Sequence, residues 1–380
     1  VLDTHAILHR VYHALSDFSL SKGEPTGALY GLCSMLMKIM TELKPDYIVA
    51  AYDLPGPTHR HLAYEKYKAH RPKAEDALVA QIIRSRDVLD AFGIDRYEKE
   101  GFEADDILGT IAEKMKHKKD VQVVIASGDM DALQLIDDQK VMVYTLKKGL
   151  SDTIMYDEEA VKNRFGFGPE QIVDYKGLRG DPSDGIPGIK GIGEVTASQL
   201  IKEFGSVEKI YDVLEHHPDW LEKAGIKKGV IEKLESQKEQ ALMSRALAEI
   251  HRDVPINFSL PEKEWRYSAD EKKTLDMFAE FEFRSLTPRL RGLFSMHDAD
   301  DAFDEIGGTL GMEEKISEEE FRPIALAVSV LDSNIPEPTV EDIYRMGRSR
   351  QFEEAKKNIL AEIKEKDLTF IYEEVELPLM

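Results

Sequence analysis

Two short apolar runs constrain the fold of this chain more than any other feature of its sequence. They read Y-I-V-A-A-Y at residues 47–52 and V-Q-V-V-I-A at residues 121–126. Such runs are typical of strands buried on both faces of a sheet, and Val1 and Leu2 fit the end of a third strand. Helical patterns alternate with the runs, over residues 27–43, 77–92 and 104–116. The alternation predicts an α/β fold with a mainly parallel central sheet flanked by helices.

Acidic residues follow the predicted strands. Asp3, Asp53 and Asp129 each come at or just after the end of an apolar run, and open α/β sheets bind ligands beyond the carboxyl ends of their strands. Further acids occur at short spacings at a helix start, after the second run and in a turn rich in Gly and Pro: Glu103, Asp105, Asp106, Asp131, Asp181 and Asp184. We therefore expect many carboxylates at one edge of the sheet.

Each acidic segment has an ordinary explanation when it is taken alone. Acids favour the first turn of a helix, and Asp is common in turns and caps. Together, however, so many carboxylates would repel one another unless cations neutralised them, and hard oxygen ligands favour Mg²⁺ or Mn²⁺. Two such ions about 3.5–4 Å apart can activate water and stabilise the leaving oxygen in phosphodiester hydrolysis.

The overall charge argues against binding to nucleic acid, but one segment is an exception. The 380 residues carry a net charge of −22, whereas phosphate contacts need local positive charge. The basic segment, defined here as residues 57–73, lies directly after Asp53 and contains Arg60, Tyr64, Lys66, Tyr67, Lys68, Arg71 and Lys73. A solvated helix face would explain the charges. Cations interleaved with aromatic residues also suit a single nucleic-acid strand, and no metal role is expected for His59, His61 or His70.

A second nucleic-acid signal lies at residues 185–205, G-I-P-G-I-K-G-I-G-E-V-T-A-S-Q-L-I-K-E-F-G. A Gly-rich turn leads into an amphipathic helix, so the backbone can approach a phosphate near free helix N–H groups. The segment resembles the helix-hairpin-helix that binds the DNA backbone without regard to sequence.

The rest of the chain divides by composition. Helical patterns dominate from residue 157, over 157–165, 169–178, 195–204, 207–214 and 227–248. We predict an α/β lobe at 1–156, a helical lobe at 157–293, an acidic linker at 294–320 and a small α+β segment at 321–380, with a strand at 325–331 followed by helices. The single cysteine, Cys33, excludes an internal disulfide and fits a reducing compartment, and no apolar run approaches the roughly 20 residues of a membrane span.

The order of the motifs resembles one family. A-Y-D-L-P-G-P-T-H-R-H with Y-K-A-H-R-P, then E-G-F-E-A-D-D-I-L-G-T, S-G-D-M-D-A-L-Q-L and L-R-G-D-P-S-D-G-I-P-G-I-K-G-I-G are similar to the 5′ nuclease (flap endonuclease-like) domain of bacterial DNA polymerase I. The resemblance runs from Val1 to about Leu293. It implies a resolvase-like or PIN-like fold. The last 56 residues or so resemble a reduced, inactive 3′-5′ exonuclease-like domain, and the polymerase domain is not in the sequence.

The resemblance also implies roles for individual residues. Asp3, Asp53, Glu103, Asp105, Asp106 and Asp129 match acids around a first metal ion, and Asp131, Asp181 and Asp184 match acids around a second. In the basic segment, Arg60, Lys66, Lys68 and Arg71 match DNA-contacting positions of a helical arch. Lys68 and Arg71 are expected at the scissile phosphate, and Tyr64 is expected to stack on a base. Gly188, Lys190, Gly191 and Gly193 match the hairpin, where family members also bind K⁺. The chain departs from the family pattern at Thr4, Met130 and Gly185, where Gly, a basic residue and Asn are usual.

These observations predict a structure-selective 5′ nuclease that uses two Mg²⁺ or Mn²⁺ ions. Its expected substrates are 5′ flaps, nicks and 5′ ends of DNA, and RNA primers on DNA. We expect a cytoplasmic, nucleoid-associated monomer with no membrane partner, and a fragment of a DNA polymerase I. Three alternatives stay open: a DNA junction-binding module without cleavage, a PIN-like ribonuclease specific for single strands, and an acidic Ca²⁺-binding protein.

Overall fold

The computed structural model describes residues 1–15, 18–148, 152–294, 316–332, 335, 338–349, 351–366, 368–369 and 372. Contacts divide the chain into two compact units. The first comprises residues 1–39 and 44–277, and the second comprises residues 40–43 and 278–380. This division lies before the predicted end of the helical lobe at 293, because the segment from Phe278 onward makes most of its contacts within the second unit.

A six-stranded sheet with the order β3-β2-β1-β4-β5-β6 forms the centre of the first unit. The strands are β1 (Leu2–Asp3), β2 (Val49–Ala51), β3 (Asp95–Tyr97), β4 (Val123–Ala126), β5 (Val141–Lys148) and β6 (Asp152–Tyr156). All neighbours are parallel except β5 and β6. Leu2 lies opposite both Ala50 and Ala126, so the strand order reverses around β1. A reversal of this kind opens a crevice at the carboxyl ends of the strands.

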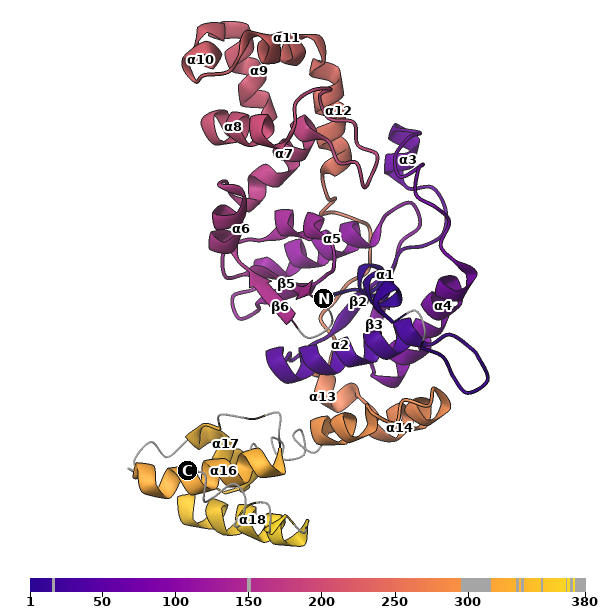
Figure 1. Cartoon of the computed structure of the whole chain (residues 1–380), viewed down its shortest axis with the longest axis vertical. Coiled ribbons are helices and arrows are strands. Elements are labelled where there is room, and N and C mark those ends of the chain that lie inside the picture. The colour runs from indigo at the N-terminus through magenta and orange to yellow at the C-terminus, as the bar shows by residue number, and fades with distance from the viewer. Residues whose placement is uncertain are drawn as a thin grey trace. The chain divides into compact units, whose positions relative to one another are not determined.

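Helices flank this sheet, as the alternation predicts (Figure 1). They are α1 (Thr4–Ala14), α2 (Gly27–Leu43), α4 (Asp76–Ala91) and α5 (Ala104–Lys116), with a short α3 (His59–Ala63) in the basic segment and a 3-10 helix η1 (Met130–Leu135). The predicted helices 27–43 and 104–116 are confirmed at both ends, and 77–92 is confirmed within one residue. Strand β3 reads D-R-Y, and because it is polar and partly exposed it had no apolar signal in the sequence.

The helical lobe of the first unit follows the sheet. It contains α6 (Glu158–Phe165), η2 (Pro169–Gln171), α7 (Ile172–Arg179), α8 (Glu194–Phe204), α9 (Val207–His216), α10 (Pro218–Lys223), α11 (Lys228–Ser236) and α12 (Lys238–Ala248). One hydrophobic core continues from the sheet, at Val49 and Ile125, into this lobe at Leu200 and Leu234. The predicted helix 227–248 is two helices, because Gln237 leaves the helical conformation, and its side chain accepts a hydrogen bond from the Lys190 N–H at 2.8 Å.

The chain then forms α13 (Trp265–Ser268) and α14 (Glu271–Glu280). Trp265 anchors this stretch to the α/β lobe, since its indole N–H donates to the carbonyl of Phe92 at 2.8 Å. Among the described residues no helix is long and apolar enough to cross a membrane.

The second unit corrects one prediction. The strand expected at 325–331 is part of helix α16 (Glu318–Leu331), which packs with α17 (Val340–Met346) and α18 (Phe352–Glu365). A short apolar run does not by itself distinguish a strand from a buried helix. Here Ile324, Ala327 and Val328 are buried at helical spacing against Ile343 and Ile359. Most of the predicted acidic linker, residues 295–315, lies outside the described residues.

Candidate active site

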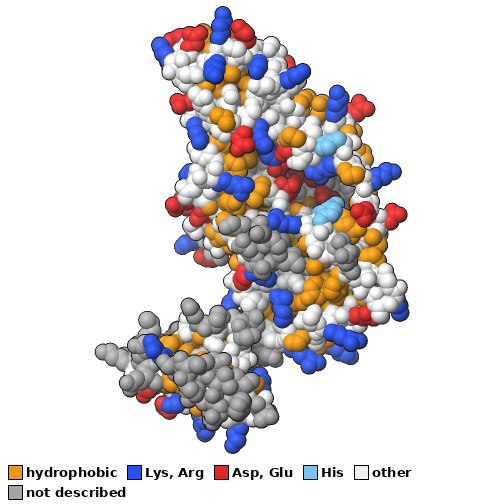
Figure 2. All heavy atoms as spheres, in the orientation of Figure 1, with side chains coloured by type: hydrophobic (Ala, Val, Ile, Leu, Met, Phe, Trp, Pro, Cys, Tyr) orange, Lys and Arg blue, Asp and Glu red, His pale blue; other side chains and the backbone are white. Residues whose placement is uncertain are grey.

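The carboxyl ends of β1, β2 and β4 border a cavity of about 930 Å³ in the first unit. Asp3 ends β1, Asp53 follows β2 and Asp129 follows β4, as the sequence predicts. The cavity is lined by eight of the predicted acids and cations, namely Asp3, Asp53, Lys68, Arg71, Glu103, Asp105, Asp129 and Asp131, together with Asp181 from the helical lobe. The space-filling view shows acidic side chains gathered in a hollow of the surface (Figure 2).

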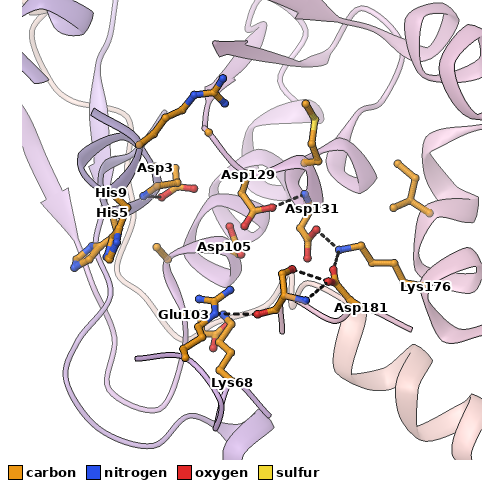
Figure 3. Close-up of a pocket in the computed structure, with 18 of the residues that line it drawn as sticks. Asp3, His5, His9, Lys68, Glu103, Asp105, Asp129, Asp131, Lys176 and Asp181 are labelled. Carbon is orange, nitrogen blue, oxygen red and sulfur yellow. Dashed lines mark hydrogen bonds and ion pairs between the residues drawn. The ribbon is translucent and has the colours of Figure 1, made fainter. Parts of the chain in front are cut away.

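On the sheet side of the cavity, Asp3 is a buried carboxylate and Asp105 is a half-buried one (Figure 3). Asp3 accepts hydrogen bonds from the Ser127 hydroxyl at 2.6 Å and the Ala6 N–H at 3.0 Å. Burial nevertheless raises the pKa of Asp3 to about 7, and the charges of Asp53 and Asp129 add to the effect. Burial also raises the pKa of Asp105 well above its ordinary value, as do Asp3 and Asp129.

On the helical-lobe side, a lysine bridges two of the predicted acids. The Lys176 ammonium group on α7 contacts Asp131 and donates to Asp181 at 2.6 Å. Burial among other acids raises the pKa of Asp131 to about 7 even though Lys176 opposes this. Asp181 also accepts hydrogen bonds from the Ser183 N–H and hydroxyl, so Lys176 and Ser183 together overcome the effect of burial and lower its pKa to about 2.

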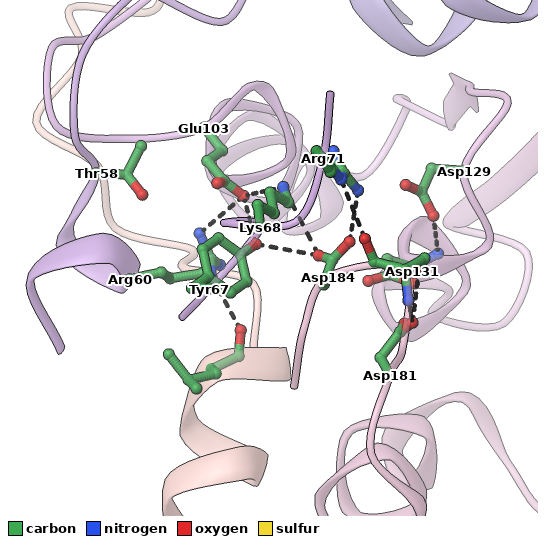
Figure 4. Close-up of polar contacts among 12 residues, drawn as sticks. Thr58, Arg60, Tyr67, Lys68, Arg71, Glu103, Asp129, Asp131, Asp181 and Asp184 are labelled. Carbon is green, nitrogen blue, oxygen red and sulfur yellow. Dashed lines mark hydrogen bonds and ion pairs between the residues drawn. The ribbon is translucent and has the colours of Figure 1, made fainter. Parts of the chain in front are cut away.

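The C-terminal end of the basic segment contacts two further acids, Glu103 and Asp184 (Figure 4). Lys68 Nζ donates to Glu103 at 3.0 Å and lies 3.7 Å from Asp184. Arg71 donates to Asp184 at 2.6 Å. The Tyr67 hydroxyl lies within hydrogen-bond distance of both acids, 3.0 Å from Glu103 and 3.1 Å from Asp184. Burial, together with the charges of Glu103 and Asp184, raises the pKa of Tyr67, so its hydroxyl stays protonated.

Asp106 and Arg60 do not occupy the positions expected of a metal ligand and a DNA contact. Arg60 donates two hydrogen bonds to Asp106, at 2.7 and 2.9 Å, and a third to the carbonyl of Leu247. Asp106 is fully buried and also accepts from the N–H groups of Glu103 and His251. Burial alone would raise the pKa of Asp106, but Arg60 overcomes this and holds it below its ordinary value. The pair links the basic segment, α5 and the end of α12, and neither side chain lines the cavity.

The other predicted DNA contacts divide into exposed and buried positions. Lys66, Lys190, Gly191 and Gly193 are exposed. Gly188 is buried, and a Cβ atom there would lie 2.2 Å from the Gly180 nitrogen. The structure therefore gives Gly188 a role in close backbone packing and leaves the hairpin surface to the other three. Tyr64 is half-buried and packs at the edge of a small cluster around Tyr67 and Val173.

The donor set of the cavity fits divalent cations. Among the described residues no three His, Cys, Asp or Glu side chains already lie close enough together to hold a metal ion. The acids nevertheless surround one cavity, and within the described part of the chain four of them, of which Asp3 is buried, have no Lys or Arg partner. A cationic group, Lys176, already lies between Asp131 and Asp181. Carboxylate oxygens are the ligands that Mg²⁺ and Mn²⁺ prefer.

Several residues of the site were not predicted from the sequence. Lys176 and Ser127 gave no signal, because Lys176 joins Asp181 to Asp131, which is 45 positions away, and Ser127 contacts Asp3, which is 124 positions away. His5, His9 and His13 also line the cavity, and their spacing of four residues on α1 could have identified a histidine-bearing helix face. His5 Nδ1 accepts a hydrogen bond from the Asp53 N–H at 3.2 Å.

Comparisons with known proteins show which families and solved structures the chain is similar to. Residues 1–166 match the family described as 5′-3′ exonuclease, N-terminal resolvase-like domain, and residues 167–271 match 5′-3′ exonuclease, C-terminal SAM fold. DNA polymerase I of Bacillus subtilis (strain 168) is 39% identical over 306 residues, which cover 80% of this chain and 34% of that protein. DNA polymerase I of Caldicellulosiruptor bescii is 38% identical over 295 residues, covering 76% and 33%. The chain thus spans about a third of the length of these relatives.

Two solved structures share the fold. T5 5′-exonuclease with bound zinc is 23% identical with a TM-score of 0.53, covering 66% of this chain and 88% of that one. A T5 flap endonuclease complex with DNA and metal ions is 19% identical with a TM-score of 0.51, covering 78% and 98%. At these identities the likeness concerns the fold, which is a mostly parallel sheet flanked by helices with a helical lobe.

Proposed function

The chain belongs to the 5′-3′ exonuclease and flap endonuclease family, and we propose that it is a structure-selective, divalent-metal-dependent 5′ nuclease. One observation carries the proposal: predicted metal-ligating acids from β1, β2, β4, α5 and the turn after α7 line one cavity, together with two cations of the basic segment. A cavity of this kind accommodates a phosphodiester between a set of carboxylates and a pair of positive charges. The T5 relatives, whose structures contain zinc or DNA with metal ions, support the same reading.

The ligands proposed for two Mg²⁺ or Mn²⁺ ions are the acids that line the cavity, together with Asp184, which contacts the lining residues Lys68 and Arg71. Asp3, Asp53, Asp105, Asp129 and Glu103 would serve the first ion, and Asp131, Asp181 and Asp184 would serve the second. When bound, such ions neutralise the acids, activate water and stabilise the leaving oxygen of the phosphodiester. Asp106 is not included, because its carboxylate is fully buried and its oxygens already accept hydrogen bonds from Arg60 and from the N–H groups of Glu103 and His251.

The chain's own cations would position the substrate. Lys68 and Arg71 contact Glu103 and Asp184 in this structure. If metal ions neutralise those acids, both side chains can turn to the scissile phosphate. Lys66 and Tyr64 would contact the 5′ strand, and Lys190, Gly191 and Gly193 would hold the duplex backbone beside a K⁺ ion. Contacts of this kind select DNA geometry rather than sequence.

The wider setting is also a proposal. The relatives are DNA polymerase I proteins of about three times the matched length, so we propose that the nuclease works beside a polymerase domain. RNA primers on DNA would then be substrates together with 5′ flaps and nicks, in the cytoplasm and at the nucleoid. A monomer is proposed, and the region 321–380 is proposed to be a reduced, inactive 3′-5′ exonuclease-like segment.

The test is cleavage of a 5′-labelled flap on a nicked duplex, with and without Mg²⁺, beside single-stranded DNA and RNA. We expect metal-dependent cutting near the flap junction and little cutting of either single strand. Asp129→Ala and Asp181→Ala should lose cleavage but keep DNA binding. Full activity in both variants would refute the proposal. Cutting of single-stranded RNA would favour the ribonuclease alternative, and binding without cleavage would favour a junction-binding module.

A further inference from the structure

One side chain of the basic segment links two acids that are distant in the sequence. Tyr67 is only 2% exposed, whereas Lys66 and Ala69 on either side are exposed. Its hydroxyl lies 3.0 Å from Glu103 Oε2 and 3.1 Å from Asp184 Oδ2 (Figure 4). A phenol has one hydrogen to donate, so the two carboxylates share a single neutral donor and are kept together by it.

The two acids belong to different parts of the first unit. Glu103 is the N-cap of α5 at the edge of the sheet, whereas Asp184 lies in the turn after α7 of the helical lobe. In the proposed nuclease, Glu103 serves the first metal ion and Asp184 serves the second. The contact through Tyr67 therefore joins the two metal subsites directly.

The backbone around Tyr67 is built for this contact. The Lys68 N–H donates to the Asp184 carbonyl at 2.8 Å. Gly185 has a φ of +71°, and a Cβ atom there would lie 2.7 Å from the Lys66 carbonyl oxygen. A side chain at 185 would push the basic segment away from the turn. Glycine at this position thus permits the close approach that brings the Tyr67 hydroxyl to Asp184.

Lys68 reaches the same two acids, but it is proposed to leave them for the phosphate of the substrate. Tyr67 has no such second task, because its ring is fixed in a small apolar cluster with Val173, Ile186 and Leu247. We propose that Tyr67 is a positioning residue whose hydroxyl sets the separation of Glu103 and Asp184 and so couples the two metal subsites. This inference rests on the proposed nuclease function.

The test compares Tyr67→Phe with Tyr211→Phe. Both substitutions remove one buried hydroxyl and keep the ring. The Tyr211 hydroxyl donates to the Leu234 carbonyl in the helical lobe and lies outside the cavity lining. Mn²⁺ binding is followed by calorimetry and by electron paramagnetic resonance, the Mg²⁺ dependence of flap cleavage is measured, and the melting temperature is recorded for each protein.

Loss of a hydrogen bond to a metal-ligating group typically weakens metal affinity about 10- to 100-fold. We therefore expect Tyr67→Phe to bind its second Mn²⁺ about 10-fold more weakly. The Mg²⁺ concentration for half-maximal cleavage should rise by a similar factor, with little change in the rate at saturating Mg²⁺. Tyr211→Phe should change neither quantity. If Tyr67→Phe binds both ions like the unchanged protein and only its melting temperature falls, its role is structural and the inference is wrong.

A second pair of variants tests the same inference without touching the hydroxyl. Gly185→Ala should displace the basic segment and weaken the second Mn²⁺ site. Gly23 is the matched control. It also has a positive φ, of +87°, but no atom lies within 4 Å of a Cβ added there, so Gly23→Ala should leave metal binding unchanged. Equal Mn²⁺ binding in both glycine variants would contradict the inference. If the unchanged protein cleaves the flap, any of these negative results overturns only the inference; if it neither binds Mn²⁺ nor cleaves, the proposed function fails as well.

Discussion

The acids of the cavity form two groups that differ in their partners. The unpaired acids, defined as Asp3, Asp53, Asp105 and Asp129, have no Lys or Arg nitrogen within 4 Å among the described residues. The paired acids, defined as Glu103, Asp106, Asp131, Asp181 and Asp184, each contact a Lys or Arg side chain. The unpaired acids lie at the sheet edge and the start of α5, whereas the cations of the paired acids come from the basic segment and from α7.

The difference shows how similar carboxylates at one site do different work. Carboxylates that lie close together without a cation destabilise the fold, most of all where they are buried as Asp3 is, and they attract ions that would relieve the cost. Paired carboxylates connect separate elements, and removal of their cation leaves a buried charge without a partner. The comparison predicts opposite signs for similar substitutions in the two groups.

The largest expected loss of stability follows from breaking the most deeply buried ion pair, which joins Arg60 and Asp106. The side chains of Arg60 and Asp106 are 3% and 0% exposed. Arg60→Met should lower the free energy of unfolding by about 3–5 kcal/mol, because it leaves the Asp106 charge buried and unpaired. Urea unfolding of the metal-free protein measures this. Arg71→Met is the matched control. Because the Arg71 side chain is 47% exposed, this substitution should lower the free energy of unfolding by less than about 1 kcal/mol.

A double variant separates this role from metal binding. Arg60→Met with Asp106→Leu removes both charges, so most of the lost stability should return, and Mn²⁺ binding should persist. If Asp106→Leu instead removes a Mn²⁺ ion while Arg60→Met leaves stability unchanged, Asp106 is a ligand as the sequence predicted, and it belongs with the unpaired acids.

The next largest effect concerns Lys176, which bridges Asp131 and Asp181. Without metal ions, Lys176→Met should lower the free energy of unfolding by about 2–3 kcal/mol, since two charge-assisted contacts are lost. Saturating Mg²⁺ should restore much of the loss, because an ion can take the place of the ammonium group between the two acids. Thermal unfolding with and without Mg²⁺ measures both effects. A loss of equal size in both conditions would contradict the idea that the two cations compete for this position.

The two groups also differ in how far the sequence predicted them. Asp3, Asp53 and Asp129 were predicted because each follows a buried strand, and strand ends are visible in apolar runs. The pairing of Asp106 with Arg60 was not predicted, because the two residues are 46 positions apart in the sequence. Contacts between residues so far apart leave no local sequence pattern. The same limit hid Lys176 and Tyr67. In the second unit, the apolar sequence of residues 325–331 is compatible with either a strand or a buried helix. Packing against the other two helices of this unit stabilises the helix.

A pair of Asp→Asn variants tests directly whether stability changes in opposite directions when an unpaired acid and a paired acid lose their charge. At pH 8, Asp105→Asn should raise the stability of the metal-free protein, because burial and the charges of Asp3 and Asp129 raise the pKa of Asp105 and make its ionisation costly. Asp181→Asn should lower stability by about 2 kcal/mol, because Lys176 and Ser183 hold the pKa of Asp181 at about 2. Urea unfolding at pH 8 compares the two, and a shift of the same sign in both would remove the distinction between the groups.

The smallest expected effect is a pH dependence of Asp3. Its pKa is about 7 in the folded protein, above the ordinary value, so its ionisation destabilises the fold above pH 7 and this cost disappears as the pH falls toward the unfolded pKa. Between pH 8 and pH 6 the unchanged protein should gain about 1 kcal/mol relative to Asp3→Asn. The Asn side chain can still accept the helix-capping hydrogen bond, and the difference between the two proteins cancels the titration of Val1 and the histidines. Mg²⁺ should remove the pH dependence, since a bound ion keeps Asp3 ionised. A difference that stays constant from pH 8 to pH 6 without Mg²⁺ would mean that Asp3 is already neutralised by the protein and belongs with the paired acids.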